Sequence, residues 1–301
     1  MKKRTRLFLL KWFTRLDRRK FLRVLPDKTY LKICFRLKMN KRLDLKNPQT
    51  FNEKLQWLKL YDRKDEYSKL VDKIEVKNYV ASIIGEEYII PTLGVWDKFD
   101  QIDFDSLPEQ FVLKCSHDSG GLVICKDKSK LDIAKAKEKI ERSLKQNYYW
   151  RGREWPYKKV YPRIMAEKYM QDGQTENLPV YKFFCFNGKA MIVQTIQNDK
   201  TPNETIDYFD REWNLLDLRQ NYPNSNKPLE KPHLFDKMLD VADKLSCGRK
   251  TFIRVDLYSI NEKIYFSEFT FYSDSGTAAF YPNCWDQKLG ELIKLPQNNI
   301  N

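Results

Sequence analysis

Residues 252–270 read FIRVDLYSINEKIYFSEFT, two strand-like runs joined by a turn around Asn261. Successive side chains of a strand point to opposite faces, so Arg254 and Asp256 lie on one face of the first run. A hairpin through residues 261–263 brings Glu268, from the second run, onto the same face. Mg²⁺ binds hard oxygen ligands and a fixed cation stabilises a moving phosphoryl group, so these side chains predict a candidate ATP site. The alternative is a surface hairpin whose two acids merely face water.

The composition is that of a folded, basic protein. The chain has 301 residues and a mass of 36.2 kDa, and its 42% hydrophobic and 14% aromatic content favours a globular protein over a disordered one. A formal net charge of +14 and a pI near 9.3 predict attraction to polyanions. Nucleic acid, an anionic lipid surface, nucleotides and acidic polysaccharide all meet that description, and charge alone does not choose among them.

The cysteines and histidines limit the chemistry. Six cysteines are scattered without a C-x-x-C pair, a usage typical of the reducing cytosol, so we expect a cytoplasmic protein. Only His117 and His233 are present, which argues against a zinc site or a mechanism that needs two histidines.

The first 26 residues form a basic segment with helical periodicity. Phe8, Trp12 and Leu16 recur at helical spacing among many lysines and arginines, which predicts a basic amphipathic helix. Such a helix either lies on an anionic membrane surface, as a peripheral contact with the inner face, or packs on the body of the protein with its basic side in solvent. The apolar run at 7–10 is too short for a signal-peptide core or a membrane span.

The remaining elements mix strands and helices without strict β-α-β alternation, so we predict an α+β fold in two packed lobes. Thr50 and Glu53 have capping-box spacing, and Gly85 is placed to end a helix that begins near Asp72. The other predicted helices span 131–144 and 234–245. The predicted strands span 111–115, 122–125, 164–170, 180–186, 190–197, 206–209, 252–258 and 264–271.

A phosphate-binding arrangement is predicted where an apolar strand ends in a lysine and a small polar loop. Lys114 supplies a point charge, and the backbone N–H groups of Ser119, Gly120 and Gly121 can fold over phosphates because glycine permits close approach. The alternative is an ordinary hairpin turn. Neither a Walker A motif nor a G-x-G-x-x-G fingerprint is present, which argues against P-loop and Rossmann folds.

A possible nucleotide hinge follows at the end of the strand at 164–170. The residues concerned are Glu167, Lys168, Tyr169 and Met170, followed by Asp172 and Glu176. Their order predicts a backbone segment that contacts adenine and an acid that contacts ribose. The same residues also suit a plain strand that runs into a turn.

Taken in order, these motifs resemble those of the ATP-grasp superfamily, in which two α+β lobes clasp ATP. The resemblance implies that ATP and Mg²⁺ bind between the lobes and that Arg254 and Lys114 are the catalytic cations. The implied phosphate contacts are Lys73, Lys114, Ser119, Gly120, Gly121, Lys182 and Arg254. The implied adenine and ribose contacts are Glu167, Lys168, Tyr169, Met170 and either Asp172 or Glu176, and the implied metal ligands are Asp256, Glu268 and Thr270.

Three segments narrow the resemblance to one branch. Residues 47–57 (NPQTFNEKLQW), 111–115 (FVLKC) and 181–188 (YKFFCFNG) are similar to the teichuronopeptide-biosynthesis, or TupA-like, branch of ATP-grasp proteins. The similarity covers roughly residues 27–295. After the basic helix expected at 1–26, it implies a pre-grasp region at 27–108, a lobe at 109–176 with the lysine and glycine loop, and a lobe at 177–296 with the metal-binding strands.

Two positions depart from the pattern of the superfamily. Many ATP-grasp ligases have Asn where this chain has Thr270, and a hydroxyl reaches Mg²⁺ or its bound water less directly. The ribose acid stays open between Asp172 and Glu176, because neither has the expected spacing.

Residues 148–157 are dense in aromatic and arginine side chains. Their rings can stack on sugar faces while Arg151 and Arg153 hold an acidic group of an acceptor. Alternatively, the stretch packs within the protein through cation–π contacts.

The resemblance implies an ATP-dependent carboxylate–amine ligase that forms an acyl phosphate during the biosynthesis of bacterial capsule, O-antigen or teichuronopeptide. The implied partners are ATP, a carboxylate-bearing polysaccharide or lipid-linked sugar acceptor, and an amino acid or amine donor. The rival interpretation is a metal-dependent glycosyltransferase that uses a nucleotide sugar, since Asp103 and Asp105 form a D-x-D motif. We do not expect a nucleic-acid partner, because no recognisable module accompanies the net charge.

Overall fold

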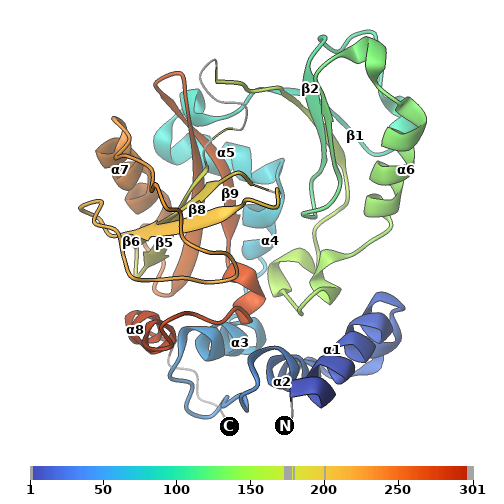
Figure 1. Cartoon of the computed structure of the whole chain (residues 1–301). Helices are drawn as coiled ribbons and strands as arrows, with labels where there is room; N and C mark the ends of the chain where they lie inside the picture. The colour runs from blue at the N-terminus through green and yellow to red at the C-terminus, as the bar shows by residue number, and fades with distance from the viewer. Residues whose placement is uncertain (1–2, 173–177, 179, 200, 297–301) are drawn as a thin grey trace.

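Two antiparallel sheets organise the chain, which confirms the predicted α+β class (Figure 1). The computed structural model describes residues 3–172, 178, 180–199 and 201–296. Within them, one sheet has the strand order β1-β4-β2-β3 and the other has the order β7-β6-β5-β8-β9. The strands are β1 (Thr92–Trp96), β2 (Phe111–Cys115), β3 (Leu122–Cys125), β4 (Ile164–Lys168), β5 (Val180–Phe186), β6 (Lys189–Gln197), β7 (Thr205–Phe209), β8 (Phe252–Ile260) and β9 (Lys263–Thr270).

Helices cover these sheets and join them to the N-terminal region. The α-helices are α1 (Lys3–Arg18), α2 (Asp27–Met39), α3 (Phe51–Tyr61), α4 (Tyr67–Val71), α5 (Glu75–Ile84), α6 (Ile133–Leu144), α7 (Phe235–Ser246) and α8 (Cys284–Leu292). The 3-10 turns used below are η1 (Phe21–Val24), η5 (Tyr148–Trp150) and η7 (Ser273–Gly276).

The sheet that contains β2 has one covered face and one face that carries charge. Phe111 and Leu113 are fully buried in the small core that β2 shares with α6, while Lys114 points to the other face. Val112 pairs with Glu167 of β4, so that carboxylate shares the face of Lys114. Because β1 pairs with β4, the boundary expected at residue 108 cuts this sheet between β1 and β2.

The five-stranded sheet is built on two tight hairpins, as the sequence predicted. Asn187 and Gly188 turn β5 into β6 with φ of 51° and 80°, and Asn261 and Glu262 turn β8 into β9 with φ of 48° and 57°. Positive φ at both central positions is the type I′ geometry, whose twist matches that of the flanking strands. These turns fix the register that places the β8 and β9 side chains opposite one another.

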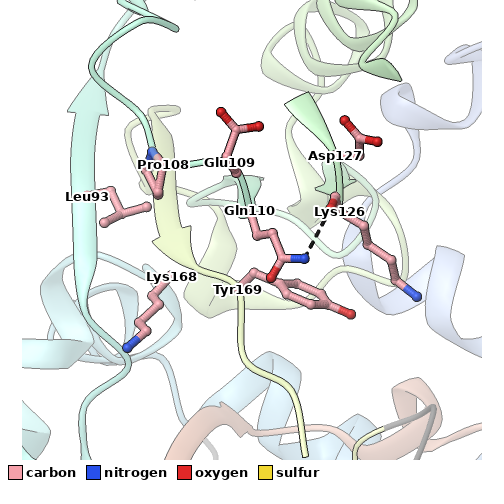
Figure 2. A pocket seen from close by; sticks show the side chains of 8 residues that line it. All are labelled: Leu93, Pro108, Glu109, Gln110, Lys126, Asp127, Lys168 and Tyr169. Carbon is pink, nitrogen blue, oxygen red and sulfur yellow. Dashed lines mark hydrogen bonds between the residues drawn. The ribbon is translucent and has the colours of Figure 1, made fainter. Parts of the chain in front are cut away.

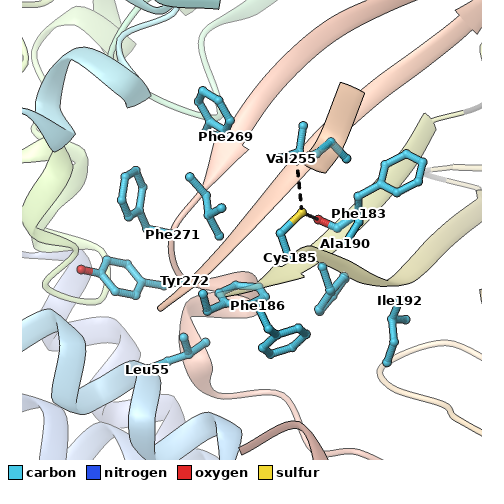
Figure 3. Packing of buried hydrophobic residues seen from close by; sticks show 14 of the residues in the cluster. Leu55, Phe183, Cys185, Phe186, Ala190, Ile192, Val255, Phe269, Phe271 and Tyr272 are labelled. Carbon is cyan, nitrogen blue, oxygen red and sulfur yellow. Dashed lines mark hydrogen bonds between the residues drawn. The ribbon is translucent and has the colours of Figure 1, made fainter. Parts of the chain in front are cut away.

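The main core covers both faces of β5. On one face Phe183 stacks on Phe235 of α7 with ring centroids 6.2 Å apart, and on the other Phe184 contacts Phe51 of α3 at 6.4 Å. Figure 3 shows residues of this core from β5, including Phe183, together with Leu55 of α3. Burial on both sides explains why β5 reads as a continuous apolar run rather than an alternating one.

Capping residues set the ends of the helices near the site. Thr50 and Glu53 form the predicted capping box, with Glu53 N donating to Thr50 Oγ1 at 3.3 Å. Gly85 ends α5 with φ of 106°, also as predicted. The helix expected from Asp72 begins later, at Glu75, because the Asp72 carboxylate accepts from Ile74 N at 2.8 Å and caps the turn before it.

The N-terminal helices lie below the two sheets in Figure 1. The predicted helix α1 packs on α2, a helix that was not among those predicted. Phe13 lies 5.3 Å from the Tyr30 ring, and Arg6 Nη1 donates to Leu37 O at 3.0 Å. The opposite side of α1 is exposed. Of the described helices, none is both long enough and apolar enough to cross a membrane.

Candidate active site

The β8–β9 hairpin places the predicted charged residues on one face. Arg254 is the Cα partner of Thr270, and Asp256 is the Cα partner of Glu268. The guanidinium of Arg254 donates from Nε and Nη2 to the two oxygens of Asp256, each at 2.7 Å. Nη2 also lies 3.8 Å from Glu268 Oε1. The shared face predicted from strand alternation is confirmed, and the binding roles of these residues stay predictions.

Arg254 is a permanent, oriented cation. It is 8% exposed, and burial alone opposes its charge. The carboxylates of Asp256 and Glu268 overcome that effect and raise the pKa of the guanidinium. Lys182, directly across from Asp256 on β5, has its pKa lowered by burial and by the charge of Arg254. An anion bound on this face therefore stabilises the charged form of Lys182.

The acids on this face suit a divalent cation bound together with phosphate oxygens. Mg²⁺ in nucleotide sites takes one or two carboxylates and completes its shell with phosphates and water. Both oxygens of Asp256 accept from Arg254, but each keeps a second lone pair. The side chain of Glu268 is 41% exposed and points its charge outward. Thr270 adds a hydroxyl on the same face.

A metal on this face depends on oxygens from a ligand. Among the described residues, no group of three or more His, Cys, Asp or Glu side chains is arranged to hold a metal ion. Two carboxylates alone leave most of the octahedral positions of Mg²⁺ open. The donor set thus fits a metal that arrives with a nucleotide better than a resident metal.

The charged face opens into a cleft of about 860 Å³. Arg254, Glu268 and Thr270 line it from β8 and β9, while Lys73 and Ser119 line it from the elements around β2. This volume is typical of small-molecule and cofactor sites. Of the predicted phosphate contacts, Lys73, Ser119 and Arg254 therefore meet at this cavity. The others are not among its lining residues: Lys114, Gly120, Gly121 and Lys182.

Lys77 and Lys114 hold the carboxylate of Glu167 between them. Lys77 Nζ lies 2.6 Å from Glu167 Oε1, and Lys114 Nζ pairs with Oε2. Burial alone raises the pKa of Glu167, but the two ammonium groups hold that pKa below its usual value. Lys77 donates its other protons to Ile90 O and Thr92 Oγ1, at 2.8 and 2.7 Å. Glu167 thus orients Lys114, and Lys77 has no donor left for a ligand.

The glycine-rich loop is held by hydrogen bonds of a buried side chain, and its tip is exposed to solvent. Asp118 is buried, and its Oδ1 accepts from Gly121 N at 3.0 Å. A Cβ at Gly121 would lie 2.5 Å from Cys115 Sγ, so glycine is needed there for packing rather than for access to phosphate. Ser119 and Gly120 are exposed at the tip. The predicted phosphate contact of this loop therefore remains open for Ser119 and Gly120, and it stays a prediction.

Lys73 supports the same loop. Its Nζ donates to the carbonyl of Asp118, and its backbone N donates to Ser116 O at 3.1 Å. The ammonium keeps two further protons and lines the cleft. It is therefore placed both to brace the loop and to meet an anion.

Part of the predicted hinge lines a cavity other than the cleft. Figure 2 shows Lys168 and Tyr169 with Gln110 in a separate pocket of about 660 Å³. Strand alternation turns Lys168 away from Glu167, and the adenine contact expected of this segment, Met170 included, stays a prediction. Asp172 lies two residues after Met170, whereas Glu176 lies outside the described residues. The choice between them for ribose stays a prediction.

The arginines of the aromatic stretch have different surroundings. Arg153 is fully buried, 4.3 Å from the Tyr30 ring and 4.4 Å from the Trp150 ring, and its Nη2 donates to Leu22 O at 2.8 Å. The packing interpretation is therefore correct for Arg153. Arg151 instead lines the cleft and lies 5.3 Å from the Tyr148 ring.

Sequence reasoning missed three charged residues near the site: Lys59, Lys77 and Asp274. Lys59 is 1% exposed, and its Nζ donates to Ser275 Oγ at 2.7 Å, which holds the turn that brings Asp274 to the cleft. Burial lowers the pKa of Lys59 to about 8. Two features of the sequence could have identified the lysines. Lys77 lies one helical turn after Lys73, and Lys59 lies four residues after Leu55, on the same side of the helix.

The D-x-D motif lines neither the cleft nor the pocket at Tyr169. Asp103 Oδ1 accepts from Asp105 N at 3.0 Å, so the motif forms its own turn. Both residues are exposed. The nucleotide-sugar interpretation therefore gains no support from the position of these two acids.

A family model described as TupA-like ATP-grasp matches residues 53–294. No curated protein matches the chain. Solved structures that are similar include the D-alanine–D-alanine ligase of Bacillus anthracis complexed with ATP (17% identity, 67% of this chain and 53% of that chain, TM-score 0.40). Another is the L-amino acid ligase of Bacillus licheniformis (12% identity, 72% and 47% covered, TM-score 0.44). This chain thus spans about half the length of those two proteins, and likenesses at such TM-scores do not bear on its activity.

Proposed function

This chain belongs to the TupA-like ATP-grasp family, and on that premise we propose that it is an ATP-dependent carboxylate–amine ligase. The observation that carries the proposal is the face of Arg254, Asp256 and Glu268, which opens into the same cleft as Lys73 and Ser119. Cations from both sides of the cleft, with acids beside one of them, are what a triphosphate with its metal needs.

The proposed reaction solves a problem of leaving-group chemistry. A carboxylate oxygen leaves poorly at neutral pH, so the γ-phosphoryl group of ATP is first transferred to the acceptor carboxylate, and ADP is released. The amine then attacks the carbonyl carbon of the acyl phosphate, an amide bond forms, and inorganic phosphate leaves. Mg²⁺ neutralises phosphate charge when bound.

Residues of the chain have distinct tasks in this scheme. Arg254 is held by Asp256 and keeps its charge, so it orients and stabilises the phosphoryl group in transfer. Lys114, oriented by Glu167, neutralises phosphate from the opposite lobe. Glu268 and Asp256 hold the metal with Thr270 beside them. The hinge segment that includes Tyr169 and Met170 contacts adenine in this scheme.

We infer that the acceptor is a carboxylate-bearing polysaccharide or lipid-linked sugar and that the donor is an amino acid or another amine. Support comes from the net charge of +14 and from the excess of cations in the cleft lining, which favour acidic substrates. The proposed setting is the assembly of bacterial cell-surface polysaccharide, such as capsule, O-antigen or teichuronopeptide.

Trapping the intermediate tests the reaction class. An acyl phosphate is electrophilic at carbon, so hydroxylamine added during turnover should give a hydroxamate together with ADP, and only when a carboxylate acceptor is present. ADP without hydroxamate points to a kinase. Sugar transfer from a nucleotide sugar without any need for ATP contradicts the ligase and supports the glycosyltransferase.

We also propose that the exposed side of α1 contacts an anionic membrane surface, on the inner face. Phe8 and Trp12 are 61% and 52% exposed on a helix rich in Lys and Arg, which suits insertion at a lipid headgroup boundary. Co-sedimentation with anionic vesicles should fall for the Phe8→Ser/Trp12→Ser variant and be unchanged for Ile124→Ser, an exposed apolar residue on β3. If wild type and both variants sediment equally, the membrane contact is contradicted and the exposed side of α1 faces solvent.

A further inference from the structure

The cleft continues past the predicted nucleotide residues onto the N-terminal helices. Arg18 from the end of α1, Lys20 and Arg23 around η1, and Lys38 from α2 all line it. These residues precede the segment 53–294 that the family model matches. Figure 1 places α1 and α2 beneath the two sheets, so they close the lower end of the cleft. The cleft therefore has a wall built from residues outside the matched segment.

The added wall is cationic and its cations are not neutralised. Within the described part of the chain, none of Arg18, Lys20, Arg23 and Lys38 has a carboxylate within ion-pair distance. The one acid on this wall, Asp17, accepts from Tyr30 OH at 3.0 Å, and burial raises its pKa, which disfavours its charge. An anionic ligand stabilises such a wall.

The charge of the whole lining exceeds what a nucleotide alone needs. Ten Lys and Arg side chains of the described lining face five Asp and Glu side chains. Lys38 Nζ donates to Thr277 Oγ1 at 3.2 Å, and Thr277 also lines the cleft, so Lys38 is directed inward. The cations therefore extend from the Arg254 face to the N-terminal wall.

The aromatic rings at this end are already engaged. Trp150 has the guanidinium of Arg23 5.0 Å from its ring and that of Arg153 4.4 Å away. Tyr148 has Arg151 at 5.3 Å and the ring of Tyr157 at 4.7 Å. Recognition here therefore rests on charge rather than on stacking against the apolar face of a sugar.

We propose that the N-terminal end of the cleft is the acceptor subsite, and that Arg18, Lys20, Arg23 and Lys38 bind anionic groups of a saccharide chain. The inference rests on the proposed ligase function, because it assigns the Arg254 end to ATP and leaves this end for the second substrate. The anionic groups are carboxylates of uronic acids or phosphates of a sugar carrier. The α1–α2 wall thereby sets the substrate class.

Binding to the nucleotide-loaded protein tests the assignment. The full chain is first titrated with a non-hydrolysable ATP analogue and Mg²⁺, and the loaded protein is then titrated with trigalacturonate, inorganic pyrophosphate or neutral maltotriose. We expect one of the two anions to bind at least about tenfold more tightly than maltotriose, with an affinity that falls as salt is raised. Trigalacturonate identifies the uronate source, and pyrophosphate identifies the carrier phosphate.

A matched pair of variants on α2 locates the binding. Lys38→Gln removes a cation from the cleft, whereas Lys32→Gln removes one from the exposed surface of the same helix outside the cleft lining. We expect Lys38→Gln to weaken binding of the anion about tenfold, the effect of losing one hydrogen bond to a charged group, and Lys32→Gln to leave it unchanged. Affinity for the ATP analogue should be equal in both.

The outcomes separate this proposal from the ligase assignment. No binding of the ATP analogue to the wild type contradicts the ligase function itself. Normal binding of the analogue, with trigalacturonate and pyrophosphate no tighter than maltotriose, contradicts the acceptor subsite and leaves the ligase intact. Equal losses for Lys38→Gln and Lys32→Gln also contradict it, because the effect is then one of general surface charge.

Discussion

Two clusters in the molecule combine carboxylates with cations, and they differ in what is left for a ligand. On β8 and β9, Arg254 takes both oxygens of Asp256, while the side chain of Glu268 stays 41% exposed. On β4, both oxygens of Glu167 are paired, to Lys77 and Lys114, and Glu167 is 5% exposed.

The difference shows that one pattern of charges serves two purposes. In the first cluster an acid is left over, so the face is able to bind a metal with its phosphates. In the second a cation is left over, because Lys114 has protons to spare and Lys77 has none. The first cluster thus presents negative charge to the cleft, which Glu268 lines, whereas the second keeps a spare positive charge and has no member among the lining residues of the cleft. Four substitutions test whether the two clusters differ in this way.

The largest effect is expected at the exposed acid. Glu268→Gln should lower ATP turnover about 100- to 1,000-fold, the range for loss of one preorganised charged group in an active site. Folding should be unchanged, because the side chain is partly exposed and its ion pair with Arg254 is long, at 3.8 Å. Steady-state turnover with Mg²⁺ measures this, and Glu262→Gln at the hairpin tip is the control. Wild-type turnover in Glu268→Gln contradicts the metal role.

The buried acid should act on stability instead. Glu167→Gln leaves Lys77 and Lys114 without a counter-charge, and breaking a buried ion pair from one side destabilises by about 3 kcal/mol. Denaturant unfolding measures the free energy, again against Glu262→Gln. A loss of turnover without loss of stability means that Glu167 contacts the ligand directly and that the two clusters are alike.

Lys114 and Lys77, the two lysines that pair with Glu167, should differ in their effect on nucleotide binding. Lys114→Ala should weaken binding of a non-hydrolysable ATP analogue by about 1.5–3 kcal/mol, as expected for a hydrogen bond to a charged group. Lys77→Ala should leave the affinity within about threefold, because its donors are all used inside the protein. Calorimetry compares them, and equal losses show that Lys77 also reaches the nucleotide.

The smallest effect is a pH dependence. The pKa of Glu167 in the folded state is held below the ordinary value of 4.5, so its ion pairs stabilise the fold above that pH and are lost as the pH falls through the folded pKa. The difference in free energy of unfolding between wild type and Glu167→Gln should therefore be constant from about pH 7 to 5. This gap should narrow below about pH 4.5, by roughly 1.4 kcal/mol for each unit by which folding lowers the pKa of Glu167. A gap that is constant down to pH 3 contradicts the ion-paired state.

Much of the fold followed from short-range patterns. Alternation and turn residues gave the strands at 111–115, 122–125 and 180–186 with the bounds observed, and the capping pair Thr50 and Glu53 gave the start of α3. These signals depend on residues close together in the chain. The helices α2 and α8 had no comparable signal, because their buried sides are defined by packing on distant elements.

By itself the sequence determined which side chains share a face of β8 and β9, since alternation and a two-residue turn fix a hairpin locally. Only the tertiary structure decided how the charges are paired. Glu167 meets a lysine 90 residues earlier because Ile90 and Thr92 hold the Lys77 ammonium beside it. Arg153 is buried because α2 and η5 close over it. Likewise, only the tertiary structure brought α1 and α2 to the cleft. Pairing and burial depend on contacts between segments that no local period of the sequence encodes.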